Sequence, residues 1–382
     1  MASDSYVNFD RHNTYAALST GEKDGVSVCG LSGETGEVRL VSAPYTAFDG
    51  SGFYNGGGYY WGWMVSPVYA TATRFDTLVP SWEATTPTGT WVELEVRVRS
   101  GGVWSGWFKM GVWASGMGSV ERHSVDGQRA GSWQVLTDTL QSIGQAFADA
   151  YQYRLTLFTE TLGVSPSVRG VSVTASNSYR HEEYPAVPVD GSLWGRELAV
   201  PGRSQMVYPN GGEAWCSPAS LSMVMAYWAG KTGRVNLNQP IPAVVRGTYD
   251  YAYRGNGNWP FNTAYASSFG LKASVNRFGS LGQVERWVAA GVPVVASIAW
   301  KSGQLSGAPI PESEGHLLVV RGFDLSGNVV VNDPAGRDDS RVRRVYRRDE
   351  FARAWASGSG GIAYLIYPDD LMPDRTYVRS SR

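Results

Sequence analysis

Apolar and polar residues alternate along much of the first 180 residues, in short segments separated by glycine, serine, proline and aspartate. A period of two places successive side chains on opposite faces of a strand, so these segments are predicted to be β-strands. The clearest are residues 90–99, 104–113, 153–158 and 168–174. Many short strands at this spacing are typical of a β-sandwich, and we predict an all-β sandwich domain over residues 1–180.

The second half of the chain mixes helical and strand patterns. Helical spacing or local composition predicts helices at residues 217–228, before Gly270, at 281–290 and at 349–355. Apolar runs predict buried strands at residues 292–298, 316–323, 328–332 and 362–367. We therefore predict the α+β class for this part, as one domain over residues 201–382. A charged, proline-containing linker over residues 181–200 joins it to the sandwich.

Cys216, one of only two cysteines, lies at the start of the first of these helices. Pro218 suits a first helical turn because its φ is fixed and it has no N–H. We place Cys216 about one residue before the helix, where unpaired N–H groups and the helix dipole stabilise a thiolate. A single cysteine in front of an apolar helix is more often a small buried hydrophobic residue, so position alone does not assign a nucleophile.

A nucleophilic thiolate needs a base, and the chain contains four histidines. His316 opens an apolar run that is predicted to be a buried strand, and a second such run ends at Asp333. If these strands pair across the turn at residues 326–328, the two side chains fall near the same end of the sheet. A carboxylate there can hold the imidazole tautomer while the other ring nitrogen faces the thiol. An ordinary Asp-Pro turn at Asp333 is the alternative.

These segments resemble the bacteriocin-processing peptidase family (family C-39) and its stand-alone relatives, which are papain-fold cysteine peptidases. The resemblance rests on residues 215–225, 315–323 and 331–335, and it covers roughly residues 200–368, under half of the chain.

The resemblance implies a role for each of four residues. Cys216 would be the nucleophile, His316 the general base and acid, Asp333 the residue that orients His316, and Gln205 a donor to the oxyanion hole. The chain departs from the family at Ser217, where glycine is usual, and in the longer spacing between Gln205 and Cys216. A surface loop position is the alternative for Gln205.

The implied reaction is hydrolysis of a peptide or protein substrate through an acyl-thioester, by a Cys-His-Asp triad that needs no metal or organic cofactor. Attack by an amine instead of water would give acyl transfer by the same triad, as in a transpeptidase, amide ligase or deamidase. An alternative of another class is a catalytically degenerate protein that binds a polymer or cell wall, and Ser217 favours it. The family members that cleave leader peptides cut after paired glycines. Because no transporter domain is attached to this chain, that cleavage preference is not carried over.

Composition narrows the partners and the location. With 43% hydrophobic and 18% charged residues and a net charge of −1, the chain gives no electrostatic reason to expect nucleic acid or an anionic membrane as partner. No apolar run approaches the ~20 residues that cross a bilayer, so we expect no membrane insertion. The 15 Trp, 21 Tyr and 46 Gly suit a sheet-rich protein outside the cell. We expect a secreted or cell-surface protein, with a signal peptide missing from this sequence, and a cytosolic protein is the alternative.

Aromatic residues crowd one stretch of the predicted sandwich: Tyr54, Tyr59, Tyr60, Trp61 and Trp63. Exposed, they would be platforms for a carbohydrate or cell-wall ligand, although burial in a core or in cross-strand pairs is the commoner fate of such residues. Cys29 alternates like a strand residue, and we expect it to be buried and not bridged to Cys216. No Cys/His cluster has metal-ligand spacing.

Overall fold

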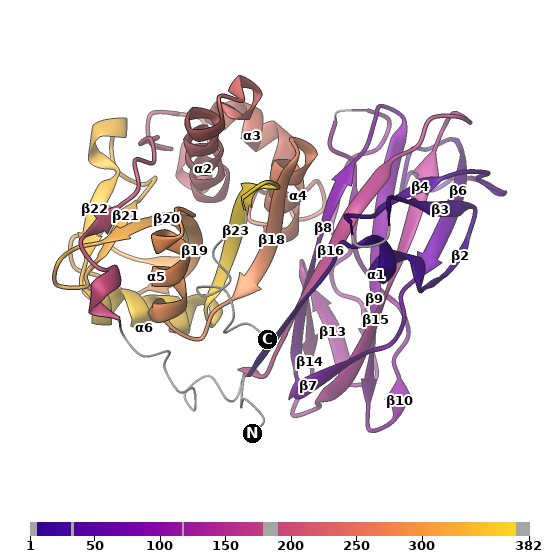
Figure 1. The fold of residues 1–382 in the computed structure, drawn as a ribbon, viewed down its shortest axis with the longest axis horizontal. Helices are drawn as coiled ribbons and strands as arrows, with labels where there is room; N and C mark the ends of the chain where they lie inside the picture. Colours follow the sequence, from indigo (N-terminus) through magenta and orange to yellow (C-terminus); the bar gives the residue numbers. More distant parts are fainter. Residues whose placement is uncertain (1–5, 32–33, 117, 179–189, 372–382) are drawn as a thin grey trace. The chain divides into compact units, whose positions relative to one another are not determined.

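The computed structural model describes residues 6–31, 34–116, 118–178 and 190–371 (Figure 1). Contacts divide the chain into two compact units. The first contains residues 1–178 and 249–268, and the second contains residues 179–248 and 269–382. The predicted domain over 201–382 thus differs from this division at residues 249–268. Residues 181–189 of the predicted linker lie outside the described residues.

The first unit contains two antiparallel sheets of eight strands each. The first sheet has the order β12-β13-β14-β8-β16-β4-β3, with β1 paired to β16. The second has the order β10-β9-β15-β6-β2, with β11 on β9, β5 on β6 and β7 on β15. The helix α1 covers Tyr15–Ser19. The strands of the first sheet are β1 (Val7–His12), β3 (Val26–Cys29), β4 (Glu37–Leu40), β8 (Thr77–Thr85), β12 (Arg129–Ala130), β13 (Trp133–Leu136), β14 (Thr139–Ser142) and β16 (Ser167–Ser176). Those of the second are β2 (Glu22–Asp24), β5 (Tyr45–Phe48), β6 (Gly58–Val65), β7 (Tyr69–Phe75), β9 (Thr90–Ser100), β10 (Val103–Trp104), β11 (Phe108–Trp113) and β15 (Ala148–Thr159).

The predicted strands at residues 90–99, 153–158 and 168–174 are confirmed as β9, β15 and β16. The strand predicted over residues 104–113 is interrupted. Its two parts, β10 and β11, both pair with β9, through Trp104 opposite Arg99 and Phe108 opposite Val96. One extra residue is therefore accommodated between them, as in a β-bulge.

The prediction that Cys29 is buried is wrong. Cys29 is the last residue of β3, which lies at the edge of its sheet, and its side chain is exposed. An edge strand has a neighbour on one side only, so alternation alone does not bury its final residue.

Residues 249–268 join the first unit because their helix α4 (Trp259–Ser268) completes its hydrophobic packing. The Phe261 ring is fully buried, with its centroid 6.1 Å from that of Trp82 on β8 and 5.3 Å from that of Trp113 on β11. The Asp138 carboxylate accepts a hydrogen bond of 2.8 Å from the Trp259 N–H at the start of α4. These contacts join residues more than a hundred positions apart, which a local pattern cannot reveal.

The second unit is built on one antiparallel sheet of seven strands, with the order β18-β23-β19-β20-β21-β22 and β17 paired to β20. Its strands are β17 (Arg196–Glu197), β18 (Leu271–Arg277), β19 (Val294–Trp300), β20 (Ser313–Phe323), β21 (Val329–Asn332), β22 (Arg343–Tyr346) and β23 (Ile362–Pro368). Its α-helices are α2 (Cys216–Thr232), α3 (Ile241–Thr248), α5 (Leu281–Ala289) and α6 (Arg348–Ser359). The predicted helices and buried strands of this region are confirmed, whereas β17 shows that the predicted linker ends before residue 196.

Helices lie on both faces of this sheet (Figure 1). Ser217 of α2 hydrogen-bonds Tyr364 on β23, whereas Trp287 of α5 packs on Tyr367 of the same strand, with ring centroids 5.6 Å apart. Strand residues separated by an odd number point to opposite faces, so α2 and α5 cover different sides. In the part of the chain that the structure describes, no helix is long and apolar enough to span a membrane.

Candidate active site

The candidate nucleophile, Cys216, is the first residue of α2, and Trp215 is the residue before it at the helix N-cap. This is one residue further into the helix than predicted, and Pro218 lies in the first turn as expected. Residues 217–228 are all buried, so α2 is a central helix held by packing on every side. Cys216 itself is only partly buried and carries a free thiol. The start of α2 therefore holds a residue that is not fully enclosed by its neighbours.

The predicted pairing of the two following strands is confirmed. Strands β20 and β21 are antiparallel neighbours, with Val319 opposite Asn332. This register brings His316 and Asp333 together, and the distance from His316 Nε2 to Asp333 Oδ1 is 2.8 Å. Both side chains are almost fully buried, at 3% and 0% exposure.

The Asp333 carboxylate is held by several donors. Its Oδ1 also accepts the N–H of Ala335 at 2.9 Å, and its Oδ2 accepts the hydroxyl of Tyr346 at 2.6 Å. Burial alone would raise the pKa of Asp333, but the charge of His316 and these hydrogen bonds outweigh it and lower the pKa below its ordinary value. Asp333 therefore remains a carboxylate next to the imidazole.

Cys216 and His316 form a second hydrogen-bonded pair. Because Nε2 of His316 is engaged by Asp333, Nδ1 is the nitrogen left to face the sulfur. Burial opposes a thiolate, but the hydrogen bond and charge of His316, aided by the N–H groups of Leu317 and Ser217, lower the pKa of Cys216. Burial likewise opposes an imidazolium, yet Asp333 and Cys216 raise the pKa of His316 to about 10. Both directions favour a thiolate–imidazolium pair.

Three further residues support this group, and sequence reasoning gave none of them a role. The Trp300 ring meets His316 edge to face, with centroids 5.5 Å apart. The buried hydroxyl of Ser220, one turn after the nucleophile, donates to the Leu317 carbonyl at 3.0 Å and so ties α2 to β20. Tyr346 reaches Asp333 because β22 pairs with β21. Trp300 lies two residues beyond the strand predicted over 292–298, and Tyr346 lies among arginines with no pattern to mark it.

Gln205 is buried in the loop before α2, so the alternative of a surface position is wrong. Its side-chain Nε2 donates to the Glu213 carbonyl at 3.0 Å, and its backbone N–H donates to the Pro334 carbonyl at 2.9 Å. It thus bridges the turn before Cys216 and the residue after Asp333. The bend of this loop requires glycine at residue 212, because a Cβ there would lie 2.2 Å from the Gln205 carbonyl oxygen.

The Ser217 side chain points toward the sheet. Its hydroxyl lies 2.9 Å from that of Tyr364 on β23, and the side chain is buried between helix and sheet. The loop after Trp300 docks on α6, where Ser306 binds the Glu350 carboxylate through its N–H at 2.7 Å and its hydroxyl at 3.0 Å. No group of three His, Cys, Asp or Glu side chains that could hold a metal ion occurs within the described residues.

Comparison with known families gives two matches. Residues 8–176 match the Peptidase C39 N-terminal domain, and residues 197–361 match the Peptidase C39 like family. No curated protein matches the chain.

Similar solved structures include two with low scores. A protein from Bacillus anthracis described as a C39-like peptidase is 18% identical, with a TM-score of 0.33, over 46% of this chain and 100% of that one. The C-terminal CBM6 of LamC, a marine laminarinase from Zobellia galactanivorans, is 12% identical, with a TM-score of 0.22, over 44% of this chain and 99% of that one. At these scores neither likeness bears on the activity of this chain.

Proposed function

Since residues 197–361 match the Peptidase C39 like family, we propose that the chain is a cysteine peptidase that cleaves peptide bonds with the triad Cys216, His316 and Asp333. The observation that carries this proposal is the continuous hydrogen-bonded series from the Cys216 sulfur through the His316 ring to the Asp333 carboxylate. It combines a nucleophile, a base and an orienting group, which is the set that acyl transfer needs.

The mechanism follows from the charges of this series. The Cys216 thiolate attacks the carbonyl carbon of the scissile bond. The oxyanion that forms accepts the Cys216 backbone N–H and the second amide N–H of Gln205, whose first is engaged by Glu213. His316 then gives its Nδ1 proton to the departing amine, and the acyl-thioester remains. In the second step the neutral His316 takes a proton from water, which hydrolyses the thioester and frees Cys216.

The rest of the proposal concerns architecture and setting. A nucleophile-bearing helix packed on an antiparallel sheet that carries base and orienting residue supports a papain-like second domain. The two sheets of the first unit support a β-sandwich. We retain a secreted or cell-surface location and a peptide or protein substrate as parts of the proposal. Ser217 was the residue that favoured a catalytically degenerate binding protein. Because its side chain points into the helix–sheet interface, it no longer supports that alternative.

The first test uses the two free cysteines of the same molecule. Iodoacetamide modification of Cys216 and of the exposed Cys29 is followed against pH by mass spectrometry, in the native chain and in His316→Ala. The lowered pKa of Cys216 predicts fast labelling below neutral pH, while Cys29 serves as the internal reference. His316→Ala removes the positive partner, so the rate at low pH should fall about tenfold for each unit by which the thiol pKa rises.

Labelling of Cys216 that follows Cys29 at every pH and ignores His316→Ala would contradict an activated thiol. Hydrolysis is tested on a mixture of peptides whose products are sequenced. Cys216→Ala should lower kcat/KM by about 10⁴-fold or more, because removal of a triad nucleophile costs at least that much. Cys29→Ala is the matched control and should retain full activity.

A further inference from the structure

A concave cleft of about 530 Å³ lies on the second sheet of the first unit, on the face opposite the buried valines and leucines of β9. Its volume is within the range of small-molecule sites, roughly 300–1,000 Å³. It is separate from the triad and has no part in the proposed peptidase reaction. The outer face of a sheet is usually covered by exposed polar side chains, so a cleft that buries charges here needs an explanation.

The register of three strands builds the floor of this cleft. Thr156 on β15 lies between Glu93 on β9 and Trp63 on β6, and the next row places Arg154 beside Glu95. Side chains two residues apart share a face, so β6 contributes an aromatic row and β9 a charged row. Trp61 and Trp63 are partly exposed, and one face of the Trp61 ring stacks on Tyr45, with ring centroids 4.4 Å apart. Glu93 and Glu95 are only 3% and 4% exposed.

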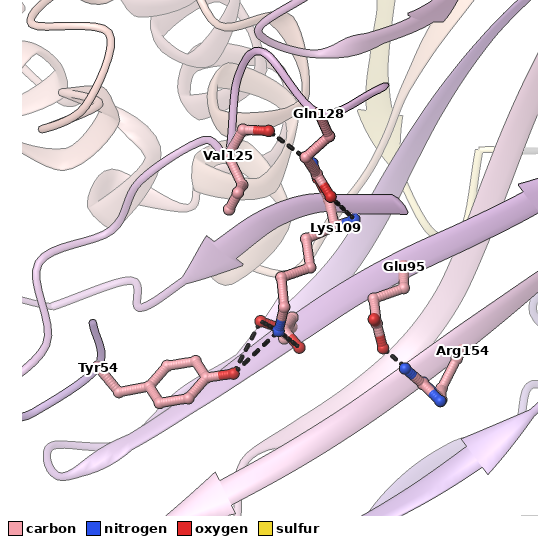
Figure 2. A network of polar contacts seen from close by, with 7 residues as sticks. Tyr54, Glu95, Lys109, Val125, Gln128 and Arg154 are labelled. Carbon is pink, nitrogen blue, oxygen red and sulfur yellow. Dashed lines mark hydrogen bonds and ion pairs between the residues drawn. The ribbon is translucent and has the colours of Figure 1, made fainter. Parts of the chain in front are cut away.

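Two carboxylates of the cleft, Glu93 and Glu95, are paired with cations. Lys109 donates to the two oxygens of Glu93 at 2.7 and 2.6 Å, and the Tyr54 hydroxyl donates to Glu93 at 2.9 Å. Arg154 forms an ion pair with Glu95 and lies 4.9 Å from the centre of the Trp107 ring. Figure 2 shows both groups side by side above the sheet. Arg97, which also lines the cleft, is bonded to the Gln152 side chain at 3.0 and 2.5 Å. The lining thus combines aromatic rings with carboxylate and guanidinium groups.

This arrangement is fixed in advance by the backbone. The ladder between β9 and β11 shifts register at Lys109, and the Gln128 side chain binds both polar backbone groups of that residue (Figure 2). Gln128 accepts the Lys109 N–H at 2.9 Å and donates to its carbonyl at 2.7 Å, and it also donates to the Val125 carbonyl. The clamp orients Lys109 toward Glu93 without a ligand, so binding costs little reordering of the site.

We propose that this cleft binds a neutral oligosaccharide. A sugar ring offers apolar C–H faces, which suit the flat rings of Trp61 and Trp63, and a rim of hydroxyls, which suit the oxygens and N–H groups of Glu95 and Arg154. A polyanion would need cations free to meet phosphates, but Lys109 and Arg154 are paired to carboxylates. The third cation, Arg97, is bonded to the Gln152 side chain and lies over the Trp107 ring. An added peptide strand would need an open sheet edge, and this cleft lies on a face.

The test is calorimetric titration of the full chain with cellohexaose, mannohexaose, chitohexaose and a soluble mixed-linkage β-glucan. At least one should bind. Trp63→Ala should weaken that binding by about tenfold or more through loss of the stacking surface. Tyr60→Ala, three residues away on the opposite face of β6, is the matched control and should bind as the native chain does. Trp63→Leu, which keeps apolar volume but loses the flat ring, replaces the alanine variant if that variant does not fold.

Salt and the triad provide two further readouts. Affinity for a neutral glycan should change less than about twofold between roughly 50 and 500 mM NaCl, because no ion pair forms on binding. Cys216→Ala should bind as well as the native chain, so failure of the peptidase proposal leaves this one intact. No binding of any of the four glycans, equal binding by the folded Trp63 variants, or binding only of a polyanion at low salt would each overturn it.

Discussion

Tyr346 helps His316 to keep Asp333 ionised, although neither its position nor its neighbours in the sequence suggest this. Its hydroxyl supplies the donor to Asp333 Oδ2, and the side chain is fully buried. In Tyr346→Phe that oxygen loses its partner, so we expect kcat/KM to fall about three- to tenfold and the free energy of unfolding to fall by about 1–3 kcal/mol. Tyr227→Phe, which removes a hydroxyl bound to the Gly291 carbonyl in the same unit, is the matched control for activity.

The same substitution should change acid stability with a defined sign. A carboxyl whose folded pKa is lowered stabilises the fold above its unfolded pKa, and this stabilisation is lost as the pH falls through the folded value. Tyr346→Phe lets the pKa of Asp333 rise toward its ordinary value, so acid unfolding should begin at higher pH than in the native chain. Urea denaturation at a series of pH values between about 3 and 7 measures the free energy of unfolding of both chains. If the two chains lost stability over the same acidic pH range, the hydroxyl would not stabilise the carboxylate.

In the proposed mechanism, Cys216 and His316 together set the pH range of activity. A lowered pKa for Cys216 and a pKa of about 10 for His316 mean that thiolate and imidazolium coexist between those values. We expect kcat/KM to rise through the pKa of Cys216, stay level, and fall only near pH 10. Initial rates with a peptide substrate, measured from about pH 5 to 11, give the profile. A decline near the ordinary histidine pKa of ~6.5 would mean that His316 is not held by Asp333.

At the scale of elements, the start of α4 depends on a buried carboxyl. Asp138 is 7% exposed, and burial raises its pKa to about 7 despite the hydrogen bonds from Trp259 and Thr139. Because the folded pKa lies above the unfolded one, the group favours the fold when protonated, and this contribution is lost as the pH rises from about 4 to 7.

Asp138→Asn keeps an oxygen for the Trp259 N–H and cannot ionise. We expect it to remove the cost of ionising Asp138 in the folded state, which lowers the free energy of unfolding of the native chain by at most about 4 kcal/mol at high pH. The variant should therefore be at least as stable as the native chain at pH 8 and should differ little from it at pH 4. Urea titrations at both pH values measure the difference. Asp126→Asn, at an exposed turn of the same unit, is the control. Equal differences at the two pH values would contradict a buried, titrating Asp138.

At the scale of the whole molecule, the first unit is completed by a segment from the middle of the chain. Phe261→Ala should lower its free energy of unfolding by about 3–5 kcal/mol, because it empties a fully buried site beside Trp82 and Trp113. Phe48→Ala, at a site that is 75% exposed, should change it by less than about 0.5 kcal/mol. Thermal unfolding followed by tryptophan fluorescence reports the result.

A fragment of residues 1–178 tests the role of the whole segment, because it contains the rest of the first unit but lacks α4. It should unfold at lower temperature than the first unit does in the whole chain and should bind a hydrophobic dye at the uncovered tryptophans. A synthetic peptide of residues 249–268 should restore part of the stability when added. A fragment as stable as the intact unit would show that the segment only rests on a finished domain.

The amino-acid sequence by itself determined most strands and helices and the order of Cys216, His316 and Asp333. A period of two, a period of 3.6 and the signals at helix starts are local properties, and hydrophobic burial acts on them wherever the chain folds. The pairing of β20 with β21 could also be predicted from the sequence, because two apolar runs joined by a short turn usually pair as antiparallel neighbours.

Only the tertiary structure decided which distant residues meet. It brought Tyr346 to Asp333 through the pairing of β22, moved residues 249–268 to the first unit, turned Ser217 toward the sheet and left Cys29 exposed. It also placed the charges of β9 opposite the tryptophans of β6 with β15 between them. The reason is physical: a local pattern fixes which way a side chain points, whereas its partner depends on strand order, register and packing across the chain.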